Sequence, residues 1–258
     1  MKLGFIGTGK ITTSVIDGLI RSKVNCKQIL ISQRNRKNSS YLKRKSKKIK
    51  VSKSNQEIIN KSSIVFISLL PKIAIKELAK LKFNKNHKIV SFVSTLNLTK
   101  LKKLCNPAKQ IIKAGPLPMA SDNLSPTILY PKDKVIANLF NKIGTVVEAK
   151  NEKQNNHLWV MTSLMASYIA LIKSFNDYLV KNKIKSTESK KYLNTFLTGM
   201  LFQLNNNSFN FDKIIKDLQT KGGINEELLK RLQKDKFFTN LQKNLNKIYF
   251  RLKKANDK

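Results

Sequence analysis

Residues 2–10 read Lys-Leu-Gly-Phe-Ile-Gly-Thr-Gly-Lys, and this stretch decides the fold. A short apolar run ends in a Gly-x-Gly turn, and residues 11–20 then carry apolar side chains at helical spacing. Between a strand and a helix, the first glycine permits a tight turn and the second lets a pyrophosphate approach the backbone at the helix N-terminus. We therefore expect the residues of this turn to bind a dinucleotide: Gly7, Thr8, Gly9, Lys10 and Ile11.

Strand and helix patterns alternate through the first 150 residues. Short apolar runs typical of buried parallel strands are separated by segments of helical periodicity. The predicted strands are 2–6, 28–32, 49–51, 64–69, 88–93, 109–113, 127–130 and 145–148. Because such alternation is typical of a doubly wound parallel sheet, residues 1–150 are predicted to form a Rossmann domain.

The strand signals stop near residue 150. Helical periodicity then covers residues 152–181, 189–204, 211–218 and 225–254. The predicted fold is therefore an α/β Rossmann domain followed by an all-α domain over residues 151–258.

The end of the second predicted strand distinguishes between the nicotinamide cofactors. NAD binders place an acidic residue there to hold the ribose hydroxyls, but no Asp or Glu occurs between Asp17 and Glu57. Ser32, Arg34 and Arg36 are suited instead to the 2′-phosphate of NADPH. The alternative is that these arginines belong to a generally basic surface. The charge pattern favours NADPH.

Ligands of open α/β sheets bind beyond the carboxyl ends of the strands. Five residues follow or end predicted strands in this way and are expected at the cofactor crevice: Ser68, Leu69, Pro71, Gly115 and Pro116.

Composition bears on the partners and the location of the chain. The net charge of +36 comes mostly from lysines spread along the chain, whereas nucleic-acid surfaces rely on arginine, so no nucleic-acid partner is expected. Cys26 and Cys105 lie far apart, which predicts no metal site, no disulfide and a cytoplasmic location. The apolar stretch 159–172 is shorter than the ~18 residues of a membrane span, so no membrane segment is expected.

Four segments resemble the pyrroline-5-carboxylate reductase family. Residues 5–11 resemble the family's opening, Phe-Ile-Gly-x-Gly-Asn-Met, and residues 65–71 resemble its fourth strand, which normally ends Val-Lys-Pro. Residues 112–118 resemble Arg-x-Met-Pro-Asn-Thr-Pro, and residues 220–225 resemble Ser-Pro-Gly-Gly-Thr-Thr. The resemblance covers essentially the whole chain. The departures, which suggest a distinct branch, include Lys10, Leu70, Leu117 and Asn225.

The resemblance implies a helical domain through which two subunits interlock, so a homodimer or a larger homo-oligomer is expected. It also implies hydride transfer from NADPH to the C=N carbon of a cyclic imine. The substrate most directly implied is 1-pyrroline-5-carboxylate, which gives proline. Another cyclic imine stays open, because the substrate side departs from the family pattern.

The substrate side is expected in the helical half. The backbone N–H groups of Gly222 and Gly223 are candidates for an anion nest that binds a substrate carboxylate, with Thr220 and Asn225 as further donors. Ser167 is a candidate hydrogen-bond or proton donor near the nicotinamide. The competing interpretation is structural, with the glycines ending one helix, Asn225 capping the next and Ser167 satisfied within the core.

Other functions are consistent with parts of the sequence. A related Rossmann dehydrogenase acting on a hydroxy acid would need a lysine as acid or base, but nothing distinguishes Lys173 or Lys181 for that role. A deazaflavin-dependent NADP reductase is disfavoured, because such enzymes lack this helical half. A non-catalytic NADPH-binding protein is the alternative that the altered Leu70 and Leu117 positions suggest.

Overall fold

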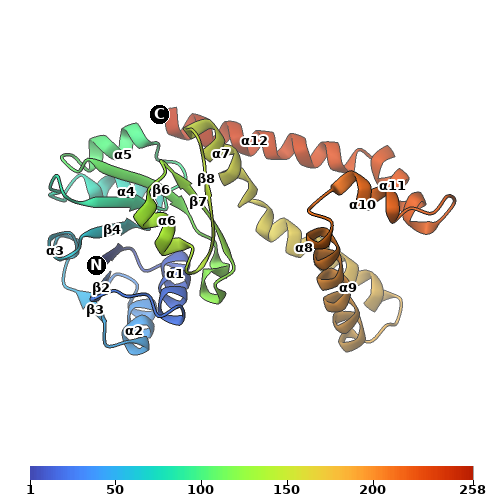
Figure 1. Cartoon of the computed structure of the whole chain (residues 1–258), viewed down its shortest axis with the longest axis horizontal. Coiled ribbons are helices and arrows are strands. Elements are labelled where there is room, and N and C mark those ends of the chain that lie inside the picture. The colour runs from blue at the N-terminus through green and yellow to red at the C-terminus, as the bar shows by residue number, and fades with distance from the viewer. Residues whose placement is uncertain (258) are drawn as a thin grey trace. The chain divides into compact units, whose positions relative to one another are not determined.

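The chain divides into two compact units by its internal contacts. A computed structural model describes residues 1–257, with side chains described for residues 1–255. One unit contains residues 1–162 together with the described end of the chain from Ile248, and the other contains residues 163–247. The first unit carries a sheet and the second is helical (Figure 1). The predicted fold class, a Rossmann domain followed by helices, is confirmed.

The described strands form one sheet in the order β3-β2-β1-β4-β5-β6-β7-β8. They are β1 (Lys2–Ile6), β2 (Gln28–Ser32), β3 (Ile49–Ser52), β4 (Ile64–Ile67), β5 (Lys88–Ser91), β6 (Gln110–Gly115), β7 (Ser125–Tyr130) and β8 (Gly144–Glu148). The order of the first six strands is that of a doubly wound dinucleotide fold. Because the chain crosses from β3 back past β1 to β4, a crevice opens at the carboxyl ends of β1 and β4.

Two strands depart from the predicted parallel sheet, because β8 runs parallel to β7 and shares its direction. β7 runs antiparallel to β6, with Gly115 opposite Ile128. The connection, residues 116–124, contains only the short 3-10 helix η1 (Pro118–Asp122). A parallel crossover needs a dozen or more residues, so this short connection makes the chain turn back on itself.

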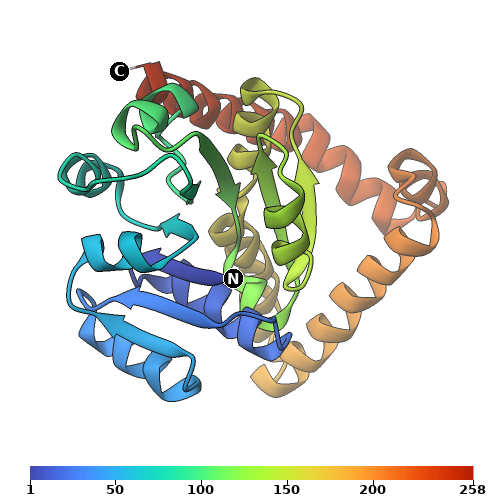
Figure 2. The same ribbon diagram turned by 60° about the vertical axis from the view of Figure 1, so that its left-hand side comes forward.

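Helices cover both faces of the sheet (Figure 1, Figure 2). They are α1 (Lys10–Arg21), α2 (Arg36–Lys45), α3 (Asn55–Lys61), α4 (Pro71–Leu78), α5 (Leu98–Leu104) and α6 (Lys134–Phe140). Neighbouring strand residues point to opposite faces, so Phe5 joins one apolar cluster and Ile6 joins the other. Side chains of α1, α2 and α6 complete the first cluster, and those of α3, α4 and α5 complete the second.

The first unit extends past the predicted domain boundary at residue 150. Trp159 of α7 (Glu152–Met161) lies against Gly115, where an added Cβ would be 3.5 Å from the indole ring. His157 stacks on Tyr249 of α12 (Phe237–Asp257), with ring centroids 4.1 Å apart. The contacts of these rings lie within the first unit, so α7 and the last turns of α12 pack as part of that unit.

The second unit consists of helices with few buried side chains. It contains α8 (Leu164–Lys181), α9 (Ser186–Asn206), α10 (Phe211–Asp217), α11 (Ile224–Lys234) and the first part of α12. No side chain of α8 is buried by the rest of the described chain. Exposed apolar side chains of this unit include Tyr168, Ile169, Tyr178, Phe196, Leu201 and Phe202. Apolar surface of this kind typically marks a site where another molecule binds.

Two of the predicted long helices are interrupted. The segment 225–254 divides into α11 and α12 at Lys236, which has a φ of 57° in the left-handed region. The segment 152–181 divides into α7 and α8 after Thr162, whose hydroxyl donates to the Trp159 carbonyl oxygen at 2.7 Å. Such a side-chain hydrogen bond competes with the backbone hydrogen bonds of the helix and favours a break. The hydrophobic periodicity continues across this break, so the sequence pattern does not reveal it.

By length and composition, residues 152–181 are long and apolar enough to cross a membrane. Mean hydropathy reaches 1.4 in an 18-residue window, of which 11% is buried. This differs from the expectation that no stretch is long enough. One such segment is weak evidence for a membrane span, because helices buried in soluble proteins meet the same criteria.

The contact between α1 and η1 provides a test of the packing. At Gly18, an added Cβ would lie 2.1 Å from the backbone oxygen of Ala120. Because backbone cannot move aside cheaply, we expect Gly18→Ala to lower the free energy of unfolding by about 1–3 kcal/mol.

Gly199→Ala in α9 is the matched control for this change. No described atom lies within 4 Å of its added Cβ, so this substitution should stabilise the helix by roughly 0.5–1 kcal/mol. Chemical unfolding of both variants, followed by circular dichroism, measures the difference. Equal effects at the two positions would contradict the proposed close approach at Gly18.

Candidate cofactor site

Gly7 and Gly9 have different physical roles in the turn between β1 and α1. Gly7 has a φ of 101°, and an added Cβ there would lie 2.1 Å from the backbone oxygen of Ser68. Gly9 has an ordinary φ of −76°, and no described atom lies within 4 Å of its added Cβ. The protein's own packing therefore requires glycine at position 7. At position 9, the missing side chain leaves space for a ligand to approach the backbone.

A set of hydrogen bonds fixes this turn. The Gly7 N–H donates to Ser32 Oγ at 2.9 Å, and the Thr8 hydroxyl donates to the Ser32 carbonyl oxygen at 3.3 Å. The Thr12 hydroxyl donates to the Gly7 carbonyl oxygen at 2.8 Å, and the Asn38 side-chain amide donates to the Thr8 carbonyl oxygen at 2.7 Å. Thr12 occupies the position where the fingerprint usually has Gly or Ala, and here its hydroxyl closes the turn.

The N-terminus of α1 is open to an anion. Gly9 is its N-cap, no side chain caps it, and no acidic residue lies in its first turn. A helix begins with N–H groups that have no partner inside the helix and with a partial positive charge. Lys10 and Ile11 begin α1, so their N–H groups are those that a bound phosphate would meet.

Two cavities open at the strand ends and share Gly7, Arg34 and Leu69. Their volumes are about 430 Å³ and 620 Å³. The first is also lined by Ser32, Gln33, Ser52, Lys53, Ser54, Asn55 and Glu77. The second is also lined by Thr8, Gly9, Asn35, Arg36, Ser68, Leu70 and Ile73. The predicted residues of β1, β2 and β4 thus come together at one crevice.

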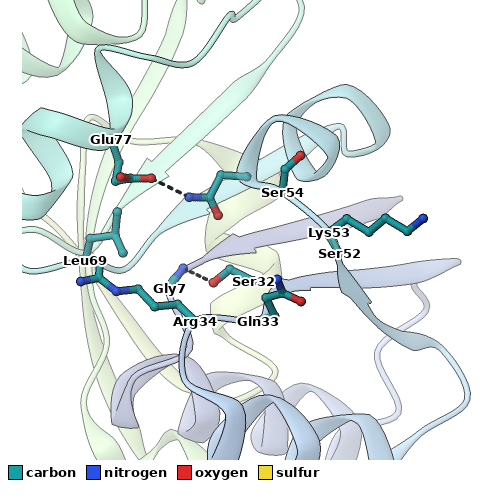
Figure 3. Close-up of a pocket in the computed structure, with 10 residues that line it drawn as sticks. Gly7, Ser32, Gln33, Arg34, Ser52, Lys53, Ser54, Leu69 and Glu77 are labelled. Atoms are coloured by element: carbon teal, nitrogen blue, oxygen red, sulfur yellow. Dashed lines mark hydrogen bonds between the residues drawn. The ribbon is translucent and has the colours of Figure 1, made fainter.

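The first cavity carries basic side chains and one acid. Figure 3 shows Arg34 with its guanidinium directed toward Leu69, whereas Lys53 extends away from Gly7. Glu77 of α4 accepts a hydrogen bond from the Asn55 side-chain amide at 3.0 Å. Sequence reasoning missed this pair and the whole segment 52–55. The segment follows β3, and strand ends are the signal that identified the other lining residues.

Pro71, Gly115 and Pro116 do not line these two cavities within the described structure. Pro71 is the first residue of α4, and Gly115 is buried at the end of β6 against Trp159. A role for these three residues in cofactor binding stays a prediction.

A lysine is completely buried beside Gly115. The side chain of Lys113 on β6 is 0% exposed. Its Nζ donates to the Ser94 carbonyl oxygen at 3.2 Å and lies 5.3 Å from the centroid of the Trp159 ring. Burial lowers the pKa of Lys113 to about 8, although the Glu152 carboxylate acts in the opposite direction. Sequence reasoning missed Lys113, because a single lysine gives no signal in so basic a chain.

The predicted anion nest lies between α10 and α11, in the second unit. Gly222 has a φ of 72°, as a nest of N–H groups requires. However, its N–H donates to Glu226 Oε2 at 2.7 Å, and the Gly223 N–H donates to the Thr220 carbonyl oxygen at 2.8 Å. The chain itself therefore supplies acceptors for both N–H groups.

Asn225 does not cap a helix and Ser167 does not lie in a core, so the purely structural roles expected for these two residues are not observed. Gly223 is the N-cap of α11, so the prediction that Asn225 caps this helix is wrong. The Asn225 amide reaches back to the Leu218 carbonyl oxygen at 3.2 Å. Ser167 lies exposed on α8 rather than in a core. Roles for these residues in substrate binding or catalysis stay predictions.

The described part of the chain shows neither a cluster of metal ligands nor an exposed thiol. No group of three or more His, Cys, Asp or Glu side chains is placed to hold a metal ion there. Cys26 and Cys105 are both buried and free. Burial raises the pKa of the Cys105 thiol to about 12, so it stays protonated at neutral pH.

The first part of the chain matches a family model described as "NADP oxidoreductase coenzyme F420-dependent". The match covers residues 2–98, which lie in the sheet unit, and does not extend into the helical half.

Curated relatives match a larger share of the chain. The chain is 31% identical over 120 residues to pyrroline-5-carboxylate reductase 3 of Danio rerio, covering 45% of this chain and 41% of that protein. It is 23% identical over 194 residues to the reductase of the same name of Bos taurus, covering 71% and 61%. In both matches, the chain spans less than two thirds of the relative.

Solved structures match the complete fold. A Plasmodium falciparum pyrroline carboxylate reductase with NADP bound superimposes with a TM-score of 0.87 at 20% identity, over 99% of this chain and 98% of that one. A Streptococcus pyogenes 1-pyrroline-5-carboxylate reductase gives 0.86 at 19% identity, over 100% and 99%. The resemblance to the pyrroline-5-carboxylate reductase family is confirmed.

Two departures from the reductase pattern lie at the ends of strands. Leu70, which replaces the family's Lys, is 71% exposed and lines the second cavity. Leu117 directly precedes η1 as its N-cap, and its N–H donates to Ser125 Oγ at 2.8 Å. An apolar side chain therefore faces the crevice where the reductase pattern has a charged one.

The buried Lys113 gives a pH-dependent prediction. Its pKa is about 8 in the folded chain, below the ordinary value of 10.5, so between these values the unfolded chain binds more protons. Stability must then rise with pH through that window, by up to about 3 kcal/mol from this group.

We expect Lys113→Met to lose this rise, and Lys109→Met, which changes an exposed lysine just before β6, to retain it. Urea unfolding at about pH 7 and about pH 10 measures the difference. The same pH dependence in both variants would exclude a lowered pKa at Lys113.

Proposed function

We propose that the chain binds NADPH at the crevice beside β1 and uses it to reduce a cyclic imine. The observation that carries this proposal is the Gly7–Gly9 turn. Its second glycine faces open space at an uncapped helix N-terminus, as a bound pyrophosphate requires. The Plasmodium falciparum reductase, which shares the fold over nearly its whole length, carries NADP in its solved structure.

The basic side chains of the crevice support the phosphorylated cofactor. Arg34 and Arg36 line the second cavity, and Arg34 also lines the first together with Lys53. Guanidinium groups bind phosphate with paired hydrogen bonds, and the carboxylate by which NAD binders hold the ribose is replaced by Ser32-Gln33 at the end of β2. Glu77 lies in the same cavity, but its carboxylate accepts from Asn55.

Imine reduction needs little chemistry from the side chains. Bound NADPH supplies a hydride to the imine carbon, and the nitrogen keeps or gains a proton to give a cyclic amine. The protein's part is to orient the ring and to exclude water. We propose Thr220, Asn225 and Ser167 as polar groups that orient the substrate.

The reference substrate is 1-pyrroline-5-carboxylate, whose reduction gives proline. The names of the curated relatives and of the matching structures support it. The resemblance assigns substrate binding to Gly222 and Gly223, which lie in the second unit.

We also propose that the working form is a homodimer or a larger homo-oligomer. Apolar side chains are exposed along the second unit, including Tyr168 and Ile169 of α8, and Phe196 and Phe202 of α9. A second copy would cover this surface and explain the apolar residues 152–181 without a membrane.

Cofactor choice is tested at Arg34. We expect Arg34→Ala to weaken NADPH binding by about 10–100-fold, because a charge-assisted phosphate contact is lost, and to leave NADH binding nearly unchanged. Arg44→Ala, which removes an exposed arginine of α2 that lines neither cavity, is the matched control. Fluorescence titration with both cofactors measures the dissociation constants. Equal losses for NADPH and NADH would show that Arg34 does not contact the 2′-phosphate.

The reaction class is tested by turnover. The purified chain should oxidise NADPH, seen as loss of absorbance, when it is given 1-pyrroline-5-carboxylate or the unsubstituted ring imine 1-pyrroline. NADPH binding without turnover on either imine would leave a non-catalytic binding protein as the function. Failure to bind NADPH would reject the cofactor assignment itself.

A further inference from the structure

The side chain of Glu226 occupies the anion nest of the second unit. Its Oε2 accepts from the Gly222 N–H at 2.7 Å, and its Oε1 lies 2.6 Å from Lys230 Nζ. Glu226 stands in the first turn of α11, one residue after the position at which the family pattern ends its Gly-Gly-Thr-Thr. The sequence from Thr220 to Glu226 is among the features that suggest a distinct branch.

Two further donors of the loop are also engaged. The Gly223 N–H donates to the Thr220 carbonyl oxygen at 2.8 Å, and the Asn225 amide donates to the Leu218 carbonyl oxygen at 3.2 Å. A carboxylate arriving from outside would therefore have to replace an existing partner at each of these groups. Only Glu226 among the partners is itself an anion.

The electrostatics of the loop oppose a second carboxylate. Lys230, followed by the Gly222 N–H, lowers the pKa of Glu226, so this side chain is ionised at neutral pH. Two carboxylates at contact distance repel each other, and more strongly where water is partly excluded. Glu226 also faces a cavity of about 450 Å³ that it shares with a second acid, Asp212.

Lysines of the same cavity do not restore an open anion site. Lys216 and Lys221 line it together with Asp212 and Glu226, so the acids and the lysines balance. Lys230, which is not part of this lining, is paired with Glu226. In the predicted nest, the Gly222 N–H is therefore already bound by a carboxylate of the chain itself.

We infer that Glu226 takes the place of a substrate carboxylate, so that this chain selects cyclic imines that carry no carboxylate next to the ring nitrogen. The inference rests on the proposed function and narrows it. The ring imine and the hydride transfer are retained, and 1-pyrroline becomes a better substrate than 1-pyrroline-5-carboxylate. Replacing Glu226 alone would then allow the loop to bind a substrate carboxylate.

Binding is tested first, without turnover, on Glu226→Ala and Glu226→Gln. L-proline is the probe and pyrrolidine, which lacks the carboxylate, is its control, both in buffered salt because the chain is so basic. Glu227→Ala is the matched variant, since Glu227 lies in the same turn and pairs with Arg231 in the same way, whereas the Gly222 N–H donates to Glu226. Circular dichroism verifies that each variant folds.

We expect Glu226→Ala to bind L-proline at least about ten-fold more tightly than the unaltered chain, and Glu226→Gln to gain less, because its amide still accepts from Gly222. Glu227→Ala and all pyrrolidine titrations should show no gain. Proline binding that is equally tight in the unaltered chain, or absent from both Glu226 variants, would overturn the inference.

The turnover measurement separates this inference from the proposed function. The ratio of kcat/KM for 1-pyrroline-5-carboxylate to that for 1-pyrroline should rise at least about ten-fold in Glu226→Ala. If the unaltered chain prefers the carboxylate substrate and Glu226→Ala does not change the ratio, the inference is overturned. Imine reduction as the proposed function is then unaffected. A gain in proline binding with no turnover of either imine rejects imine reduction and supports Glu226 as the group that fills the nest.

Discussion

The close approach of Gly7 to the backbone of Ser68 is the constraint on which the crevice depends. An added Cβ at Gly7 would come within 2.1 Å of that backbone oxygen, so the end of β1 and the end of β4 can be this close only at a glycine. The Gly7 N–H then meets Ser32 Oγ at 2.9 Å, which brings the end of β2 to the same point. Three strands are thereby fixed around one turn, and α1 begins three residues later, at Lys10, with its N-terminus at the same turn.

The sheet was predictable because its signals are local. A strand buried on both faces needs a continuous apolar run, and an amphipathic helix needs a 3.6-residue period, so the alternation of the two specified the architecture. The direction of β7 was not predictable in this way, since its apolar run fits either direction and only the short connection through η1 decides it. The breaks at Thr162 and Lys236 were missed for a related reason: each depends on one residue's hydrogen bond or φ, which hydrophobic periodicity does not record.

The lining of the crevice was predictable where a residue lies at a strand end or shortly after it. Ser32, Arg34 and Leu69 were found by that rule, and the same rule, extended to β3, would have found Asn55. Glu77 and Lys113 were out of reach. Glu77 enters the cavity from the side of a helix, and Lys113 is distinguished only by its burial, which brings it to the Ser94 carbonyl oxygen and the Trp159 ring. Both depend on tertiary contacts between segments that are distant in sequence.

In a chain with a net charge of +36, positive charge alone cannot single out an anion site. What distinguishes such a site is backbone geometry together with the presence or absence of an internal acceptor. The chain has two glycine-rich turns at helix N-termini, and they differ in this respect. At Gly9 the approach is open and α1 carries no acid in its first turn, whereas at Gly222 the N–H is bound by Glu226, from the first turn of α11. The same local device thus serves an anionic cofactor in one unit, while in the other a residue of the chain itself is the anion.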